Sequence, residues 1–312
     1  MTERTEPLYR LITRSDMDGL VCAVLLTELN LIGDIKFVHP KDMQDGKIQV
    51  TASDITTNLP YVPGVHMAFD HHLSETIRNE KHANHIIDPD APSAARVVYD
   101  YYGGKNRFPN VSEAMMIAVD KADAAQFSRE DILNPQGWEL LSFLMDARTG
   151  LGRFRTFRVS NYQLMMDLIA YCRDHGIDDI LALPDVKERV DLYLQHDALA
   201  KEQILRCTRV LGNLAVLDLR GEETIYATNR FTIYALFPEI NISIHVMWGV
   251  QKQNTVFATG KSILDRSSRT NVGELMLKYQ GGGHLNAGTC QIANEQAEQV
   301  LAELIAAIRA DG

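Results

Sequence analysis

The sequence has few cysteines and no cysteine motif. The four cysteines are Cys22, Cys172, Cys207 and Cys290, and no two of them form a CxxC pair. Disulfide scaffolds and thiolate zinc sites are typically built from numerous or closely spaced cysteines. The sequence therefore argues against both kinds of site and indicates a reducing compartment.

A long apolar segment is absent as well. No stretch reaches the roughly 18 uninterrupted apolar residues of a transmembrane helix. The first ten residues are polar and charged, and they lack the apolar region of a signal peptide. These features predict a cytoplasmic protein that has no membrane partner.

The chain also lacks an excess of positive charge. Of its 312 residues, 31 are Lys or Arg and 41 are Asp or Glu, which gives a net charge of −10. This balance excludes a surface that is basic throughout, although a local basic groove is compatible with it. With 46% hydrophobic and 23% charged residues, the composition is that of a globular protein rather than a disordered one.

The first half of the chain alternates apolar strand patterns with helical patterns. Strands are expected at 8–13, 48–53 and 65–69, and helices at 20–29, 94–102 and 111–125. Strands that alternate with helices indicate a parallel α/β sheet. Such sheets bind their ligands beyond the carboxyl ends of the strands.

The second half changes character after a helix-rich segment. Residues 185–209 contain no Gly or Pro, and they fit either a helix that bridges two domains or an ordinary packed helix. Further strands are expected at 214–219, 224–227, 240–248 and 255–260, followed by a helix at 295–309. At about 150 residues per domain, the length corresponds to two domains or one large one. We expect an α/β domain over 1–190, a helical linker over 191–212 and a smaller α/β domain over 213–312.

Acidic residues and histidines follow each expected strand of the first half. These residues are Asp16, Asp18, Asp54, Asp70, His71 and His72. The helix that follows adds Asp120 and Asp123, about one turn apart. Each piece alone is compatible with a turn or a helix cap, but together they would gather at one sheet edge. So many carboxylates need counter-charge, and with imidazole they suit two divalent ions such as Mn²⁺, Mg²⁺ or Zn²⁺.

These motifs give the sequence a resemblance to the DHH phosphoesterase superfamily, which includes RecJ-type exonucleases, nanoRNases, cyclic-dinucleotide phosphodiesterases and family II inorganic pyrophosphatases. The resemblance rests on the DMDG turn at 16–19, Asp54, the DHH signature at 70–72 and the DAAQF segment at 123–127. It implies a parallel α/β catalytic domain that binds two metal ions, typically Mn²⁺, with Mg²⁺, Co²⁺ or Zn²⁺ as substitutes.

The resemblance also implies a role for each matching metal ligand. Asp16 would hold the first ion and Asp18 the second, and Asp54 would bridge the two. His71 and Asp123 would complete the second site.

Three further residues receive roles from the same resemblance. Asp70 would orient His71, a usual companion of a ligating imidazole, and His72 would contact the substrate phosphate or donate a proton to it. Asp120 competes with Asp123 for the last ligand position.

One position departs from the family's pattern. Many members carry a histidine just before the first acidic pair, where this sequence has Thr-Arg-Ser at 13–15. Arg14 cannot ligate a metal because its guanidinium offers no lone pair. We therefore expect the first ion site to be weaker, rebuilt by another residue or absent.

A second signal lies near the end of the chain. Three consecutive glycines and a histidine at 281–284 let the backbone approach an anion closely. The segment resembles the GGGH motif of the DHH-associated domain, in which an Arg-Ser pair lines the same groove. The expected substrate-binding residues are Arg266, Ser267, Arg269, Gly281, Gly282, Gly283 and His284.

The sequence thus predicts a metal-dependent phosphoesterase that hydrolyses short single-stranded oligonucleotides or nucleotides with a metal-activated hydroxide. An exopolyphosphatase is an alternative, as is a catalytically weakened regulatory protein that binds a phosphorylated ligand. A homodimer could form through apolar helices such as 164–171.

Overall fold

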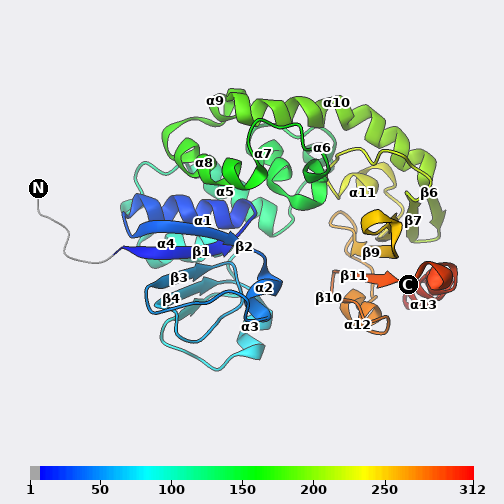
Figure 1. Cartoon of the computed structure of the whole chain (residues 1–312), viewed down its shortest axis with the longest axis horizontal. Helices are drawn as coiled ribbons and strands as arrows, with labels where there is room; N and C mark the ends of the chain where they lie inside the picture. The colour runs from blue at the N-terminus through cyan, green and yellow to red at the C-terminus, as the bar shows by residue number, and fades with distance from the viewer. Residues whose placement is uncertain (1–7) are drawn as a thin grey trace, which may run out of the picture. The chain divides into compact units, whose positions relative to one another are not determined.

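The computed structural model describes residues 8–312, which form two compact units (Figure 1). The first unit comprises the described residues up to Gln126 together with Pro135–Asp191, and the second comprises Phe127–Asn134 with Leu192–Gly312. Helix α10 (Pro184–Cys207) contributes residues to both units. Across residues 8–312, the structure contains no helix with the length and apolar character needed to cross a membrane.

The first unit is built on a parallel sheet of five strands in the order β2-β1-β3-β4-β5. Its strands are β1 (Tyr9–Arg14), β2 (Ile32–Val38), β3 (Asp54–Thr57), β4 (Met67–Asp70) and β5 (His85–Ile87). The predicted parallel α/β fold is therefore confirmed. Because all five strands run the same way, their carboxyl ends lie at one edge of the sheet.

Helix α1 (Met17–Glu28) is the central helix of this unit. Ten consecutive residues from Met17 to Leu26 are buried, because α4 (Ala94–Tyr101), α5 (Glu113–Asp123) and α8 (Asn161–Asp174) pack against it. A helix enclosed on all sides needs apolar residues around its whole circumference, as the run from Leu20 to Leu26 provides. The remaining helices are α2 (Pro40–Gln44), α3 (Leu73–Arg78), α7 (Gly137–Met145) and α9 (Ile177–Ala182).

The second unit contains a six-stranded sheet in the order β10-β11-β9-β8-β7-β6. Its strands are β6 (Thr208–Leu211), β7 (Leu214–Asp218), β8 (Ile242–Trp248), β9 (Thr255–Lys261), β10 (Gly282–His284) and β11 (Ala287–Ile292). All neighbours are antiparallel except β7 and β8. Short helices α6 (Arg129–Leu133) and α11 (Thr232–Leu236) belong to the same unit.

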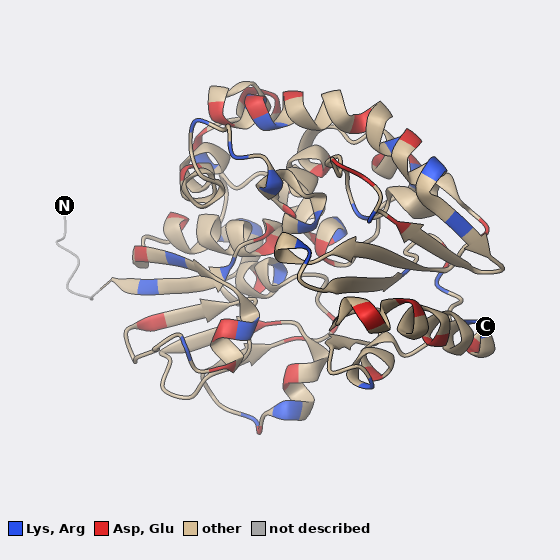
Figure 2. Cartoon of the chain, turned by 45° about the vertical axis from the view of Figure 1, so that its right-hand side comes forward, with Lys and Arg blue, Asp and Glu red and all other residues tan. Residues whose placement is uncertain are grey.

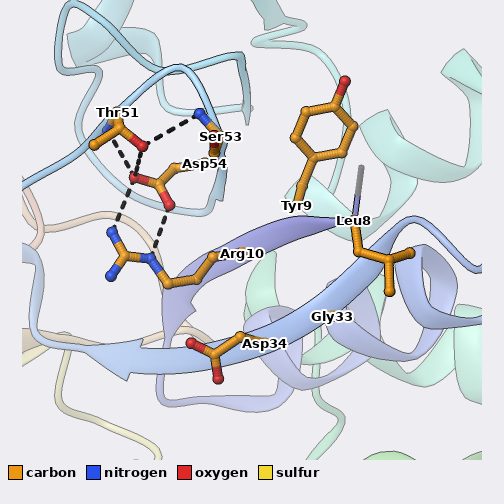
Figure 3. Close-up of a pocket in the computed structure, with 8 residues that line it drawn as sticks. All are labelled: Leu8, Tyr9, Arg10, Gly33, Asp34, Thr51, Ser53 and Asp54. Atoms are coloured by element: carbon orange, nitrogen blue, oxygen red, sulfur yellow. Dashed lines mark hydrogen bonds and ion pairs between the residues drawn. The ribbon is translucent and has the colours of Figure 1, made fainter. Parts of the chain in front are cut away.

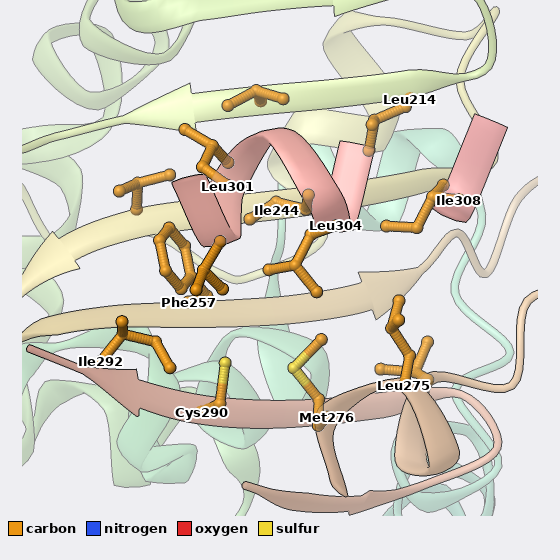
Figure 4. Close-up of a cluster of buried hydrophobic side chains, with 14 of the residues drawn as sticks. Leu214, Ile244, Phe257, Leu275, Met276, Cys290, Ile292, Leu301, Leu304 and Ile308 are labelled. Atoms are coloured by element: carbon orange, nitrogen blue, oxygen red, sulfur yellow. The ribbon is translucent and has the colours of Figure 1, made fainter. Parts of the chain in front are cut away.

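The core of the second unit lies between this sheet and two helices, α12 (Val272–Leu277) and α13 (Ala297–Asp311) (Figure 4). Alternate residues of β8, namely Ile242, Ile244 and Val246, enter it, and Leu304 and Ile308 of α13 meet them from the helix side. The period of two along β8 places Ser243, His245 and Met247 on its other face.

Two of the expected strands are wrong. Residues 48–53 are not a strand; β3 begins at Asp54, the residue that was expected to follow it. Residues 224–227 are irregular. The first of these errors changes the composition of the candidate site.

Candidate metal centre

Three of the predicted ligands meet beyond the carboxyl ends of β1 and β4. Asp18 lies in the first turn of α1, His71 follows β4 and Asp123 ends α5. One ligand atom from each residue lies within 4.8 Å of those of the other two. The sequence order of the motifs thus predicted a real cluster.

The Asp18 carboxylate is held by the beginning of helix α4. Its two oxygens accept hydrogen bonds from the backbone N–H groups of Ala94 (3.0 Å) and Ala95 (2.7 Å). The residue is 1% exposed, and burial together with the charges of Asp123 and Asp16 raises its pKa well above the ordinary value. A divalent cation would supply the counter-charge that favours its ionised form.

The ring of His71 is oriented by a backbone carbonyl. Its Nδ1 lies 3.1 Å from the oxygen of Ala91, and because a carbonyl only accepts, Nδ1 carries the hydrogen. Nε2 lies 2.8 Å from Oδ2 of Asp123. Burial lowers the pKa of His71, but the hydrogen bond and charge of Asp123, with the charge of Asp18, outweigh it and raise the pKa to about 9.

Asp16 lies beside this group, and both of its carboxylate oxygens are engaged by other residues of the chain. Its Oδ1 accepts from the Gly19 N–H (3.0 Å) and from Nδ2 of Asn58 (3.1 Å), and its Oδ2 lies 2.8 Å from Nε of Arg14. Asp16 is the N-cap of α1. Glycine is required at position 19 because a Cβ there would lie 1.9 Å from the carbonyl oxygen of Arg14.

Asp54 is at the opposite end of the sheet, so its expected bridging role is wrong. It starts β3, in register with Arg10 near the start of β1. Nε and Nη2 of Arg10 donate to its two oxygens at 2.8 and 2.9 Å, and the Thr51 N–H donates at 2.6 Å (Figure 3). Burial raises the pKa of Asp54, but these donors outweigh it and lower the pKa. Asp54 therefore acts as a structural anchor.

Asn58 takes the strand-end position that was assigned to Asp54. It follows Thr57 at the carboxyl end of β3 and is 1% exposed, with φ of 53° in the left-handed region. Its Nδ2 reaches Asp16, while its Oδ1 is buried without a hydrogen-bond partner. Sequence reasoning missed this residue; ending the strand at the β-branched pair Thr56-Thr57 would have found it.

Asp70 orients His72, not the ring of His71 as expected. Its Oδ1 lies 2.7 Å from Nδ1 of His72 and accepts the backbone N–H of His71 at 2.9 Å. Asp70 is 1% exposed, whereas the His72 side chain is 42% exposed. The pair therefore presents an imidazole to solvent with a buried carboxylate behind it.

Asp120 does not compete with Asp123. It accepts from Oγ of Ser93 (2.7 Å) and from Nε of Arg96 (3.0 Å), both at the start of α4. Ser93 in turn caps α4 by accepting the Arg96 N–H. Asp120 thus supports the helix whose N–H groups hold Asp18.

The predicted glycine motif forms strand β10 in the second unit. A Cβ on Gly281 would lie 2.2 Å from the carbonyl oxygen of Thr289, and one on Gly283 would lie 2.3 Å from that of Ala287. The close pairing of β10 with β11 therefore requires these glycines. All three β10 residues, Gly282, Gly283 and His284, are exposed.

The predicted substrate-binding residues at 266–269 form hydrogen bonds with other residues of the second unit. Nε of Arg266 donates to the Ile263 carbonyl at 3.4 Å, and the side chain is exposed. Oγ of Ser267 accepts from Nδ2 of Asn241 at 3.0 Å. The Arg269 N–H donates to the carbonyl of Gly312 at 3.3 Å. Binding of substrate by this segment stays a prediction.

Asp18, His71 and Asp123 fit a divalent cation by their chemistry. Two carboxylates and one imidazole, whose Nδ1–H is engaged elsewhere, are a donor set suited to Mn²⁺, Mg²⁺ or Zn²⁺. The Nδ1 contact with Ala91 is the outer support usual for a ligating histidine.

Comparison with known proteins gives a consistent picture. No family model and no curated protein sequence matches the chain. Among solved structures, the pGpG-specific phosphodiesterase PggH from Vibrio cholerae is 64% identical with a TM-score of 0.87, over 97% of this chain and 100% of that one. RecJ from Thermus thermophilus, in complex with Mn²⁺, is 12% identical with a TM-score of 0.54, over 96% of this chain and 52% of that one. CDC45 from Entamoeba histolytica is 8% identical with a TM-score of 0.54, over 97% and 95%. The last two show similarity of fold alone.

Proposed function

Because the chain belongs to the DHH phosphoesterase superfamily, it is a hydrolase of phosphoester bonds, and we propose that its substrate is the linear dinucleotide pGpG. The observation that carries the proposal is the 64% identity with a pGpG-specific phosphodiesterase over almost the whole of both chains. The cluster of Asp18, His71 and Asp123 at the carboxyl edge of the sheet gives this similarity a chemical basis.

Asp18, His71 and Asp123 would hold a divalent cation, for which we propose Mn²⁺. When bound, the cation supplies positive charge that stabilises the charge developing on the phosphate. The protein contributes the rigidity of the ligands. Asp18 is fixed by two backbone N–H groups and His71 by one carbonyl, so neither needs to reorganise when substrate binds.

We assign proton donation or phosphate contact to His72. Its Nδ1 is bound to Asp70, which leaves Nε2 as the polar atom of the ring available to a substrate. The buried Asp70 carboxylate faces Nδ1 and fixes the orientation of the ring, whose imidazolium form donates from both nitrogens. In this form Nε2–H can pass its proton to the leaving oxygen of the phosphodiester.

In the second unit, we assign binding of a substrate phosphate to Arg266, Ser267, Arg269, the glycines of 281–283 and His284. The exposed backbone of β10 supports this assignment, as does the planar guanidinium of Arg266, which suits a phosphate. The division into a catalytic domain over 1–190, a linker over 191–212 and a substrate-binding domain over 213–312 is part of the same proposal.

The alternatives predicted from the sequence receive less support. A polyphosphate chain needs a continuous basic channel, whereas acidic and basic residues are interspersed on the helices and loops (Figure 2), and the net charge is −10. A binding protein without turnover is the second alternative, and the experiment below decides it.

The test is to incubate the purified protein with each of four substrates: pGpG, a longer oligonucleotide, polyphosphate and bis-p-nitrophenyl phosphate. Hydrolysis of each is measured with Mn²⁺, Mg²⁺, Co²⁺ or Zn²⁺. We expect pGpG to give the highest kcat/KM, with GMP as the product seen by chromatography. His71→Ala and Asp123→Asn should abolish turnover. If the protein binds pGpG but hydrolyses none of the four substrates with any of these metals, the proposed activity is wrong and the regulatory protein is favoured.

A further inference from the structure

We propose that the centre binds one divalent cation per chain, and that the Arg14 guanidinium supplies the positive charge that a second cation would bring. The inference deepens the proposed function, on which it rests for the identity of the site. It concerns the side of the centre where Asp16 and Asn58 lie.

The bonding of Asp16 is the first argument. Its Oδ1 already accepts two hydrogen bonds, from Gly19 and Asn58, and its Oδ2 is paired with Arg14 at 2.8 Å. A cation at Asp16 would have to displace a guanidinium and face the hydrogens of an amide. Asp16 is therefore the anchor of Arg14 rather than a ligand.

The identity of residue 58 is the second argument. A ligand that bridges two cations needs two oxygens and a negative charge, as a carboxylate provides. Asn58 is neutral, and its Nδ2 presents hydrogens toward Asp16. Only Oδ1 remains, buried and without a hydrogen-bond partner, and one carbonyl oxygen of this kind can contact a single cation.

The balance of charge is the third argument. Asp16, Asp18 and Asp123 together carry three negative charges when ionised. One divalent cation and the Arg14 guanidinium carry three positive charges and neutralise them. A second divalent cation would leave two positive charges in excess in a largely buried group, which is costly.

This arrangement also gives Arg14 a function toward substrate. Its Nε is engaged by Asp16, and its side chain is one-third exposed, so its terminal nitrogens can reach a phosphate oxygen. A guanidinium fixed beside a single cation would thus do what a second cation does elsewhere: bind and polarise the phosphate.

The direct test counts ions. We expect isothermal titration of metal-free protein with Mn²⁺ to give one site per chain, and the electron paramagnetic resonance spectrum to show an isolated ion at every Mn²⁺ ratio. The double variant Arg14→His/Asn58→Asp restores two ligands and should bind two ions with a spin-coupled spectrum. Two ions, or none, in the unaltered protein would overturn the inference.

The role of Arg14 toward substrate is tested separately. Arg14→Gln should keep one Mn²⁺ per chain but lower kcat/KM for pGpG by about 100-fold, with Arg14→Lys recovering part of the loss. Arg10→Gln is the matched control, because Arg10 lies on the same strand and also pairs with an aspartate, but at the other end. An Arg14→Gln variant as active as Arg10→Gln would overturn the role of Arg14.

The two proposals fail differently. If the protein binds one Mn²⁺ but hydrolyses another phosphodiester in preference to pGpG, the proposed substrate is wrong and the ion count stands. If pGpG is hydrolysed and two ions bind, the proposed function stands and this inference is wrong.

Discussion

At the scale of single residues, the same substitution is expected to have different effects at two of the predicted metal ligands. In one aspartate it should reduce activity, and in the other it should reduce stability. Asp123→Asn removes the charge that faces His71 and should lower kcat/KM at least about 100-fold. Asp54→Asn weakens the pair with Arg10 and should cost about 1–2 kcal/mol of unfolding free energy, with kcat/KM kept within about threefold.

Steady-state kinetics with pGpG and urea denaturation of the same preparations measure both effects. A loss of activity in Asp54→Asn that equals the loss in Asp123→Asn would return Asp54 to the metal centre. A stable Asp54→Asn variant would instead mean that the Arg10 pair contributes little.

A second residue-scale prediction concerns Asp70 and His72. If Asp70 acts through the His72 ring, Asp70→Asn should lower kcat by about 10–100-fold and leave Mn²⁺ affinity unchanged. His72→Gln should have a similar effect, and the double variant should be little worse than either single variant. Additive losses in this double-mutant cycle would show that the two residues act independently.

The contrast between Asp54 and Asn58 shows what the residue patterns could reveal. Ile48 and Val50 look like a strand, but they pack from a loop against the small core around Ile12. The true strand β3 contains two buried threonines, and Oγ1 of Thr57 donates to Oγ1 of Thr13 at 2.7 Å. Because that strand has only four residues and a single apolar side chain, Ile55, hydrophobicity did not reveal it. The strand-end rule was sound, but it was applied to the wrong strand.

At the scale of elements, helix α4 is the support of the cluster. Its first N–H groups hold Asp18, its cap is Ser93, and Asp120 of α5 binds both Ser93 and Arg96. We expect Asp120→Ala to weaken Mn²⁺ binding about 10-fold by loosening this helix start, without removing a ligand. Isothermal titration measures the change.

The matched control for this prediction is Asp100→Ala, an exposed aspartate on α4. It should leave Mn²⁺ binding unchanged. Equal losses in the two variants would mean that general destabilisation of α4, rather than support of its first turn, sets the affinity.

The helices of the first unit were easier to predict than its ligands. Expected helices at 20–29, 94–102 and 111–125 overlap α1, α4 and α5, because their apolar patterns report packing on the sheet and on one another. Strands β2 and β5 were missed. β2 is an edge strand with exposed Gly33 and Asp34, and β5 has three residues, so neither shows a clear period of two.

At the scale of the whole molecule, the order of the two sheets along the chain was predictable from the sequence. The interruption of the first unit by a segment of the second was not predicted. Residues Phe127–Asn134 belong to the second unit, although the chain returns to the first unit immediately afterwards. They are joined to it by long-range contacts: Nδ2 of Asn229 donates to the Ile132 carbonyl, and Nε of Arg129 donates to the Ala235 carbonyl. Nothing in the local composition of the segment specifies partners about 100 residues away.

Stability of the whole chain should depend on pH through His245 in the central strand β8. Burial lowers the pKa of this histidine to about 4, against 6.5 for an exposed one. Between these two pH values the unfolded chain binds more protons than the folded chain, so stability falls as the pH decreases from 6.5 to 4. The side chain is only partly buried from solvent, which reduces the energy that corresponds to this pKa difference. We therefore expect the free energy of unfolding to fall by about 2 kcal/mol through this group.

The measurement is urea unfolding of metal-free protein at several pH values, followed by tryptophan fluorescence, because Trp248 lies on the same strand. His245→Gln removes the titrating group, so the unaltered protein should lose about 2 kcal/mol more than the variant between pH 6.5 and 4. Carboxylates elsewhere contribute equally to both chains and cancel in the difference. Parallel pH profiles would show that the folded protein accommodates a charged His245, and that β8 is more hydrated than its place in the sheet implies.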